Sequence, residues 1–96
     1  MKPGGDAWLF DNDEAGYLAW VQSNPGGFVA NVDRAGRVPQ YPMIHRARHA
    51  VASSPRIGNF TTRDYVNVCA GALEALEADL CSRYARPVTR CRVCMG

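Results

Sequence analysis

Residues 63–84 read RDYVNVCAGALEALEADLCSRY and contain the two clearest structural signals of the chain. Over residues 63–69, the chain alternates between two sets of side chains, which is the two-residue period of a strand. Val66 and Val68 lie on one side, and Tyr65, Asn67 and Cys69 on the other. Over residues 72–84, large apolar side chains recur at steps of three and four, which predicts an amphipathic helix. The stretch therefore predicts a strand that is followed directly by a helix.

Further elements are expected upstream of this stretch. A first helix is predicted over residues 11–23, because Asp11 and Glu14 have the spacing of a capping box. The sequence NPGG ends this helix, since the residue before a proline avoids helical angles. Two short strands are then expected at residues 28–32 and 41–45. The segment after them, HRARHAVA, fits one or two helical turns.

The order helix, strand, strand, strand, helix predicts an α+β fold. We expect a small, mostly antiparallel three-stranded sheet with N- and C-terminal helices, in which the second and third strands are neighbours. The chain has 96 residues, which is enough for one core, so residues 1–96 are expected to form a single domain with a flexible N-terminus over residues 1–10. A domain with a core of this size often needs an additional stabilising crosslink, such as a bound metal ion.

The composition excludes two classes of protein. Hydrophobic residues make up 47% and charged residues 21%, which is close to the globular average and unlike a disordered or a membrane protein. No uncharged stretch is long and apolar enough to span a bilayer. The first residues lack the apolar core of a signal peptide, so we expect a cytoplasmic, nucleoid-associated protein with reduced thiols.

Charge is segregated along the chain. Residues 1–33 carry a net charge of −4 and residues 34–63 a net charge of +6, with no acid in the second block. Residues 64–80 carry −4 and residues 81–96 carry +4. Two basic blocks of this kind attract polyanions over a Debye length of about 8 Å, and nucleic acid is the natural partner. The alternative is that these charges only solvate the surface.

Two pairs of metal-binding side chains stand out. Cys91 and Cys94 form a CxxC, and His45 and His49 are four residues apart, so each pair can supply half of a tetrahedral zinc site. If the second and third strands are neighbours and the last helix packs back on the third, both pairs meet at one end of the sheet. We therefore predict a structural zinc ion on these four residues. Cys69, expected at the far end of its strand, is the replacement ligand if His45 faces the core or DNA.

Other interpretations of the cysteines stay open at this point. The CxxC could be free of metal or redox-active, although no helix follows it to lower a thiol pKa. No nucleophile with a base and no phosphate-binding loop is recognisable, so we expect that the protein is not an enzyme. A zinc site with one open position is the only catalytic route that the sequence suggests.

Four segments together resemble a known family. They are YLAWVQSNPGGFVANVDR at residues 17–34, YPMIHRARHAVA at 41–52, FTTRDYVNVCAGALEAL at 60–76 and CRVC at 91–94. This combination resembles a small bacterial domain that occurs alone or in front of HNH nucleases of the McrA-like, modification-dependent restriction class. The resemblance implies binding of double-stranded DNA that contains 5-methylcytosine.

The chain departs from the family pattern at two positions. His49 stands where the family has a cysteine after His-Arg-Ala, which keeps a zinc-ligand type. Asn67 stands where the family has a lysine before Val-Cys, which removes one charge that would contact phosphate.

The leading hypothesis is a non-enzymatic module that binds methylated double-stranded DNA. Arginine can neutralise phosphates and grip guanine bidentately, so the expected DNA contacts are Arg34, Arg37, Arg46, Arg48, Arg56, Arg63, Arg90 and Arg92. A methyl group is read by apolar contact, and the aromatic residues near the basic block are the expected walls of a methyl-base pocket: Tyr41, Phe60 and Tyr65. The alternative is a zinc-stapled protein-interaction adaptor without DNA binding.

Overall fold

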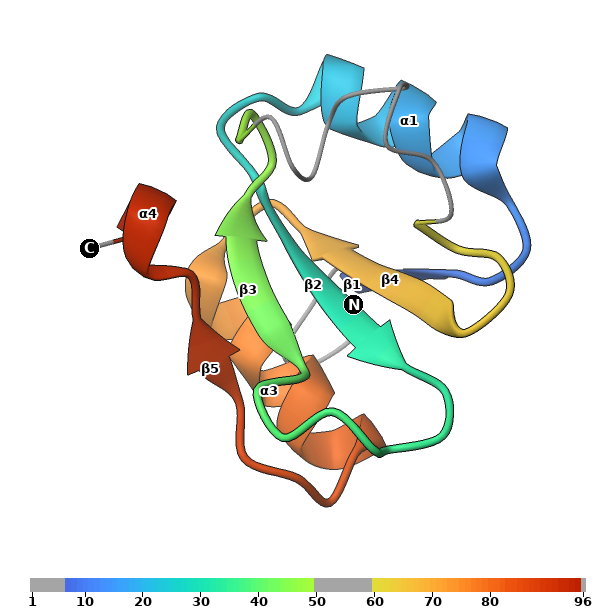
Figure 1. Ribbon diagram of the computed structural model, residues 1–96. Helices are drawn as coiled ribbons and strands as arrows, with labels where there is room; N and C mark the ends of the chain where they lie inside the picture. Colours follow the sequence, from blue (N-terminus) through green and yellow to red (C-terminus); the bar gives the residue numbers. More distant parts are fainter. Residues whose placement is uncertain (1–6, 50–59, 96) are drawn as a thin grey trace.

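Residues 7–49 and 60–95 are described by a computed structural model, with the side chains of residues 94 and 95 outside the described part. In these parts the chain has an α+β fold, in which two helices cover a five-stranded sheet (Figure 1). The helices are α1 (Glu14–Ser23) and α3 (Leu73–Arg83), and a single turn, α4 (Arg92–Met95), follows the last strand.

The centre of the sheet is β2 (Phe28–Asp33), which is buried at four of its six positions, three of them apolar. It pairs antiparallel with β4 (Tyr65–Ala70) on one side and with β3 (Met43–Arg46) on the other, so both of its edges are hydrogen-bonded. The edges are β1 (Ala7–Phe10), antiparallel to β4, and β5 (Thr89–Arg90), parallel to β3. The strand order is therefore β1-β4-β2-β3-β5.

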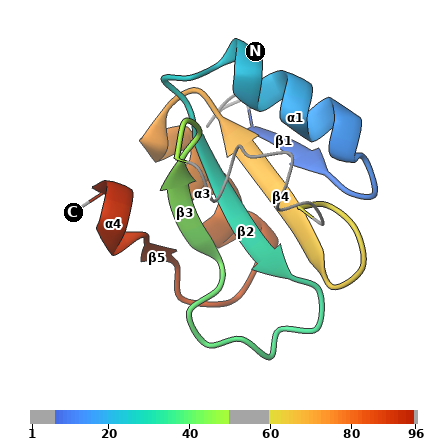
Figure 2. The same ribbon diagram turned by 45° about the horizontal axis from the view of Figure 1, so that its top comes forward.

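Strand alternation sends side chains to two separate cores, one on each face of the sheet. Figure 2 shows α1 and α3 on opposite faces of the sheet. On one face, α3 packs against the strands through Ala30, Val32, Ile44, Val66, Val68, Ala70, Leu76 and Leu80. On the other face, α1 packs through Tyr17, Val21, Val29, Ala47, Phe60 and Cys69. The second face also carries His45 and Asn67, because each alternates with a residue of the first core.

The α+β class, the α3 helix and the three central strands are confirmed, but the expected three-stranded sheet is wrong in its strand count. Ala7–Phe10, expected within a flexible N-terminus, pair with β4 along their whole length as β1. Residues 1–6 lie outside the described part of the chain. Thr89–Arg90 form β5, which at two residues is too short to show a sequence period.

The expected pairing of the second and third strands is also wrong. They correspond to β3 and β4, and β2 lies between them. Both are antiparallel to β2, so they run parallel to each other. Val29 is the register partner of His45 on one side and of Cys69 on the other, which places these two residues at the same end of the sheet.

Two local expectations need correction as well. The first helix is capped by Asp13, whose carboxylate accepts a hydrogen bond from the Gly16 N–H, and not by Asp11. The predicted helical turn after the second strand is absent from its described part, since His45 belongs to β3 and residues 47–49 form a turn. Residues 50–52 lie outside the described residues. Within the described residues, no helix is long and apolar enough to cross a membrane.

Candidate metal centre and basic surface

His45 is held on β3 with its imidazole almost completely buried, at 5% exposure. Its Nδ1 has no hydrogen-bond partner among the described residues. Burial lowers the pKa of His45 to about 4, and repulsion from His49 contributes to the decrease. The ring is thus neutral at pH 7, which is the form that binds a metal ion.

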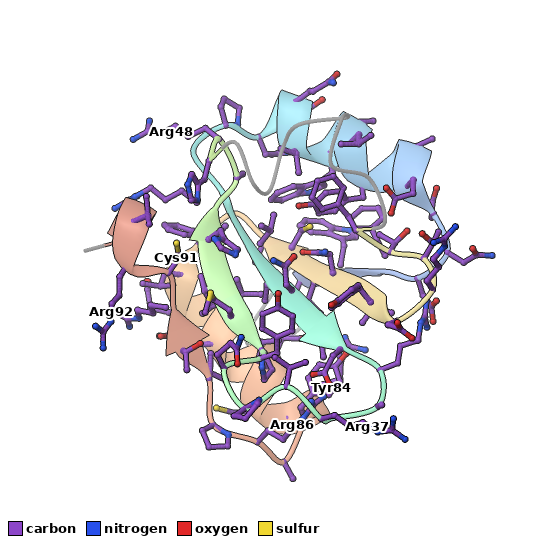
Figure 3. The ribbon with its side chains drawn as sticks, in the orientation of Figure 1. Arg37, Arg48, Tyr84, Arg86, Cys91 and Arg92 are labelled. Atoms are coloured by element: carbon purple, nitrogen blue, oxygen red, sulfur yellow. The ribbon has the colours of Figure 1, made fainter. Side chains whose placement is uncertain are left out.

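Two further ligand side chains reach His45 from different parts of the chain. The His49 N–H donates to the Arg46 carbonyl in a turn, which brings the second imidazole back to a ring distance of 5.5 Å from the first. Cys91 follows β5, and its N–H donates to the Ile44 carbonyl at 2.8 Å. The parallel pairing of β5 with β3 therefore positions the Cys91 thiol beside both rings. Figure 3 shows Cys91 next to β3.

The three ligand atoms of this group lie within 4.8 Å of one another. In a tetrahedral zinc site with Zn–N and Zn–S bonds of the usual length, neighbouring ligand atoms are roughly 3.3–3.7 Å apart. The group therefore needs to contract by only about an ångström to hold zinc. Two imidazoles, one of which has an orphaned buried nitrogen, and one thiol fit a transition-metal site. We call His45, His49 and Cys91 the His-Cys group.

The fourth predicted ligand, Cys94, lies in α4, and its side chain is outside the described part of the structure. Cys69 is not the replacement ligand in this arrangement, because His45 itself belongs to the group and β2 separates it from Cys69. The Cys69 thiol packs in the core under α1, where burial raises its pKa. Cys69 does lie near the C-terminal end of β4, but the expectation that this end is far from His45 is wrong. An intervening strand, not distance along the sheet, keeps this thiol out of the group.

Several arginines of the basic blocks are used inside the fold. Arg34 pairs with Asp11 at 2.7 Å and donates to the carbonyls of Thr61 and Arg63. Arg90 pairs with Glu77 at 2.6 Å. The predicted DNA contacts at these two arginines therefore compete with internal ion pairs. The same pairing occurs outside the predicted set, at Arg83 with Asp79 and at Arg86 with Asp33.

Other predicted arginines are exposed, and within the described residues no acid pairs with them: Arg37, Arg48, Arg63 and Arg92. Figure 3 shows Arg48 and Arg92 on the side of the sheet that carries Cys91, and Arg37 at the opposite end. Arg46 lies over the Phe28 ring at 5.6 Å. Arg56 lies outside the described residues.

The three predicted pocket aromatics separate into a pair and a core residue. The rings of Tyr41 and Tyr65 meet edge to face at 5.9 Å, and both are half-buried. Phe60 is buried at 4% exposure and packs on Tyr17 with the ring centroids 4.9 Å apart. Phe60 is thus a core residue and not a surface wall, because the α1 face needs a large apolar side chain there.

The sequence identified Asn67 only as the loss of a family lysine and did not predict its burial. Asn67 is 1% exposed, and its Oδ1, like Nδ1 of His45, is a buried atom without a hydrogen-bond partner among the described residues. The available signal was an asparagine in the middle of an apolar strand, a position that asparagine disfavours.

The chain was also compared with known proteins. No family model matches it, and the searches of curated proteins and of solved structures found no similar protein either.

Proposed function

We propose that this chain is a zinc-stapled, non-enzymatic module that binds double-stranded DNA and prefers DNA containing 5-methylcytosine. The observation that carries the proposal is the division of the arginines into two sets. Four are used in ion pairs with acids of the fold, while four exposed ones have no acidic partner among the described residues. Exposed cations that the fold does not use are available to phosphates.

The position of the unpaired arginines suits a duplex. Arg48 and Arg92 lie at the end of the sheet that carries the His-Cys group. At the other end, Arg37 follows β2 and Arg63 precedes β4. The six-residue β2 connects the two ends, and at about 3.4 Å per residue it spans roughly 20 Å. This length corresponds to about six base pairs, so both ends can contact one side of the same duplex.

The metal would act on this surface by positioning residues. His45, His49 and Cys91 would hold zinc, with Cys94 as the fourth ligand, and the ion would supply only a fixed crosslink between β3 and the segment after β5. Arg48 precedes one ligand and Arg92 follows another, so the crosslink would fix both arginines relative to the sheet. Charges held in place lose less conformational entropy when they contact phosphates.

Preference for methylated DNA is supported by the family resemblance and by the tyrosine pair. Tyr41 and Tyr65 offer half-buried aromatic surface at the end of the sheet that carries Arg37 and Arg63. Burial of one methyl group contributes only about 0.8 kcal/mol, so a preference above about tenfold requires a preformed apolar contact.

Fluorescence anisotropy with one duplex in methylated and unmethylated forms tests the proposal. We expect tighter binding of the methylated duplex and a log–log salt slope near −0.9 for each phosphate contact. A protein-interaction adaptor would show neither the slope nor the methyl preference. If both duplexes bind equally and in a salt-dependent way, the proposed DNA binding stands and the proposed methyl preference is wrong.

A further inference from the structure

Asn67 is a buried amide with one unused hydrogen-bonding atom. Its Nδ2 donates to the Phe60 carbonyl at 2.7 Å. Because a carbonyl can only accept, this bond fixes which end of the amide is the nitrogen and leaves Oδ1 as the other end. Oδ1 has no partner among the described residues, although the side chain is 1% exposed. Native structures rarely keep such an acceptor without a reason.

The other orphaned atom on this face has an explanation that does not extend to Asn67. His45 belongs to the His-Cys group, so a metal ion accounts for its buried nitrogen. Asn67 lies on β4, two strands away from His45, and is not a member of that group. Its free acceptor therefore needs a partner of a different kind.

Aromatic rings lie next to Asn67 on the same face of the sheet. Tyr65 is two residues before it on β4, so both side chains leave the strand in the same direction. The Tyr65 ring contacts Tyr41 edge to face, and the Tyr41 N–H donates to the Val38 carbonyl in the loop that also carries the exposed Arg37. A buried acceptor thus lies on the same face as two half-buried rings, and an exposed cation lies in the adjoining loop.

This combination is suited to a planar ring with an amino group. The rings offer stacking surface, and a lone acceptor selects a hydrogen-bond donor. Among pyrimidine bases, cytosine presents a 4-amino donor where thymine presents a carbonyl acceptor. We propose that Asn67 Oδ1 accepts a hydrogen bond from the 4-amino group of a cytosine that lies against Tyr41 and Tyr65. This inference rests on the proposed DNA binding and names the group that selects the base.

The position of Asn67 also determines how the base is reached. Asn67 lies on β4, an inner strand of the sheet, and almost none of its surface is exposed. A side chain in that position cannot enter a groove to touch the edge of a stacked base. The cytosine must therefore leave the helical stack, as in enzymes that act on extruded bases.

The experiment uses two duplexes that share one guanine-containing strand. In one duplex the target position opposite guanine is 5-methylcytosine, and in the other it is thymine. Both bases carry the 5-methyl group, so they differ mainly in amino against carbonyl at position 4. A thymine opposite guanine is mispaired and therefore easier to extrude. If ease of extrusion alone determined affinity, the protein would bind the thymine duplex more tightly. We expect the wild-type chain to prefer methylcytosine by at least tenfold despite this advantage.

Asn67→Leu should reduce that ratio to near one while salt-dependent binding persists. The matched control is Asn24→Leu, because Asn24 also donates its Nδ2 to a backbone carbonyl, that of Trp20, at 2.8 Å. Both variants lose one such bond. A comparison of the two therefore distinguishes a general loss of stability from a specific loss of base selection. Asn24→Leu should keep the wild-type ratio.

Each remaining outcome has a definite meaning. An unchanged ratio in folded Asn67→Leu overturns the inference, since the amide is then structural only, while DNA binding stands. If no duplex binds in a salt-dependent way, the proposed function fails and the inference fails with it. If Asn67→Leu does not fold, the wild type decides: a methylcytosine-to-thymine ratio near one overturns the inference. A high ratio, together with several-fold tighter binding when the guanine is replaced by an abasic site, supports it.

Discussion

Cys91 Sγ lies 3.9 Å from His49 Nδ1, although 42 positions separate the two residues in the chain. Local sequence cannot bring them together. The contact depends on β5, which runs parallel to β3 and delivers the thiol to the imidazoles. The His-Cys group is therefore a tertiary feature, and its occupancy by zinc should change the stability of the whole sheet.

We predict that one zinc ion binds per chain through the His-Cys group. Cys91→Ser and His49→Ala should each lose the ion and lower the melting temperature, because metal binding contributes directly to folding free energy. Native mass spectrometry and thermal melting measure the two effects. The control is Cys81→Ser, since Cys81 is exposed on α3 and outside the group. A wild-type chain that is free of metal and equally stable with chelator would contradict the prediction.

Asp33 should be the main source of acid sensitivity. Its nearly buried carboxylate accepts hydrogen bonds from the Val38 N–H at 3.0 Å, from the Arg37 N–H and from the Arg86 guanidinium at 2.9 Å. Burial acts to raise the pKa of Asp33, but the three hydrogen bonds outweigh it and hold the pKa below its usual value of 3.8. A carboxyl group of this kind stabilises the fold above its unfolded pKa, and the effect is lost as pH falls through the lower folded pKa.

Urea unfolding at a series of pH values tests this assignment. At pH 7, Asp33→Asn should lower the free energy of unfolding by about 3 kcal/mol, because it leaves a partly buried guanidinium without its charge partner. The variant should also lose less stability than the wild type on acidification below about pH 4. Asp11→Asn is the control, since the Asp11 to Arg34 pair is largely exposed. Equal acid sensitivity in Asp33→Asn and the wild type would refute the assignment.

Arg90 and Arg92 form a matched pair for DNA binding. Arg90 is engaged with Glu77, whereas the exposed Arg92 has no acidic partner among the described residues. Arg92→Ala should therefore reduce the salt slope of DNA binding by about one unit, and Arg90→Ala should leave the slope nearly unchanged. The opposite ranking would show that the ion pair opens on binding and that internal pairing does not identify the contacts.

Phe60 and Tyr41 should respond differently to truncation. Phe60→Leu removes ring packing against Tyr17 in the α1 core and should lower the free energy of unfolding by about 1–2 kcal/mol. Tyr41→Ala should change stability less and should reduce the ratio of methylated to unmethylated affinity. Circular dichroism melting and anisotropy titrations separate the two effects. If the two variants cost equal stability and Tyr41→Ala keeps the full methyl preference, the tyrosine pair is not part of the binding surface.

The sequence is informative wherever one strong period covers an element. The leucine spacing places α3 within one residue at each end, and the apolar runs locate β2 and β4. Short edge strands carry no comparable signal, because four residues in β1 and two in β5 are defined by their partners. The sheet order was also inaccessible, since chain order alone does not reveal that β2 separates β3 from β4.

The candidate site shows the same limit in two ways. His45, His49 and Cys91 are identifiable by residue type, but they meet through the parallel pairing of β5 with β3. The expected pairing of the second and third strands does not occur. The charge blocks are real in the sequence, yet folding places acids of one block against arginines of another, as with Asp11 and Arg34. Net charge per block therefore overstates the basic surface, because ion pairing is decided by tertiary neighbours.

The two-residue length of β5 has a consequence for protein turnover. The segment after α3 is attached to the sheet by few backbone bonds, among them Thr89 N–H to the Pro42 carbonyl and Cys91 N–H to the Ile44 carbonyl. Without a metal crosslink, so short a strand detaches more readily than a long one and offers an extended peptide to proteases. The lifetime of this chain in a cell should then follow the zinc supply, and degradation should begin from its C-terminal segment.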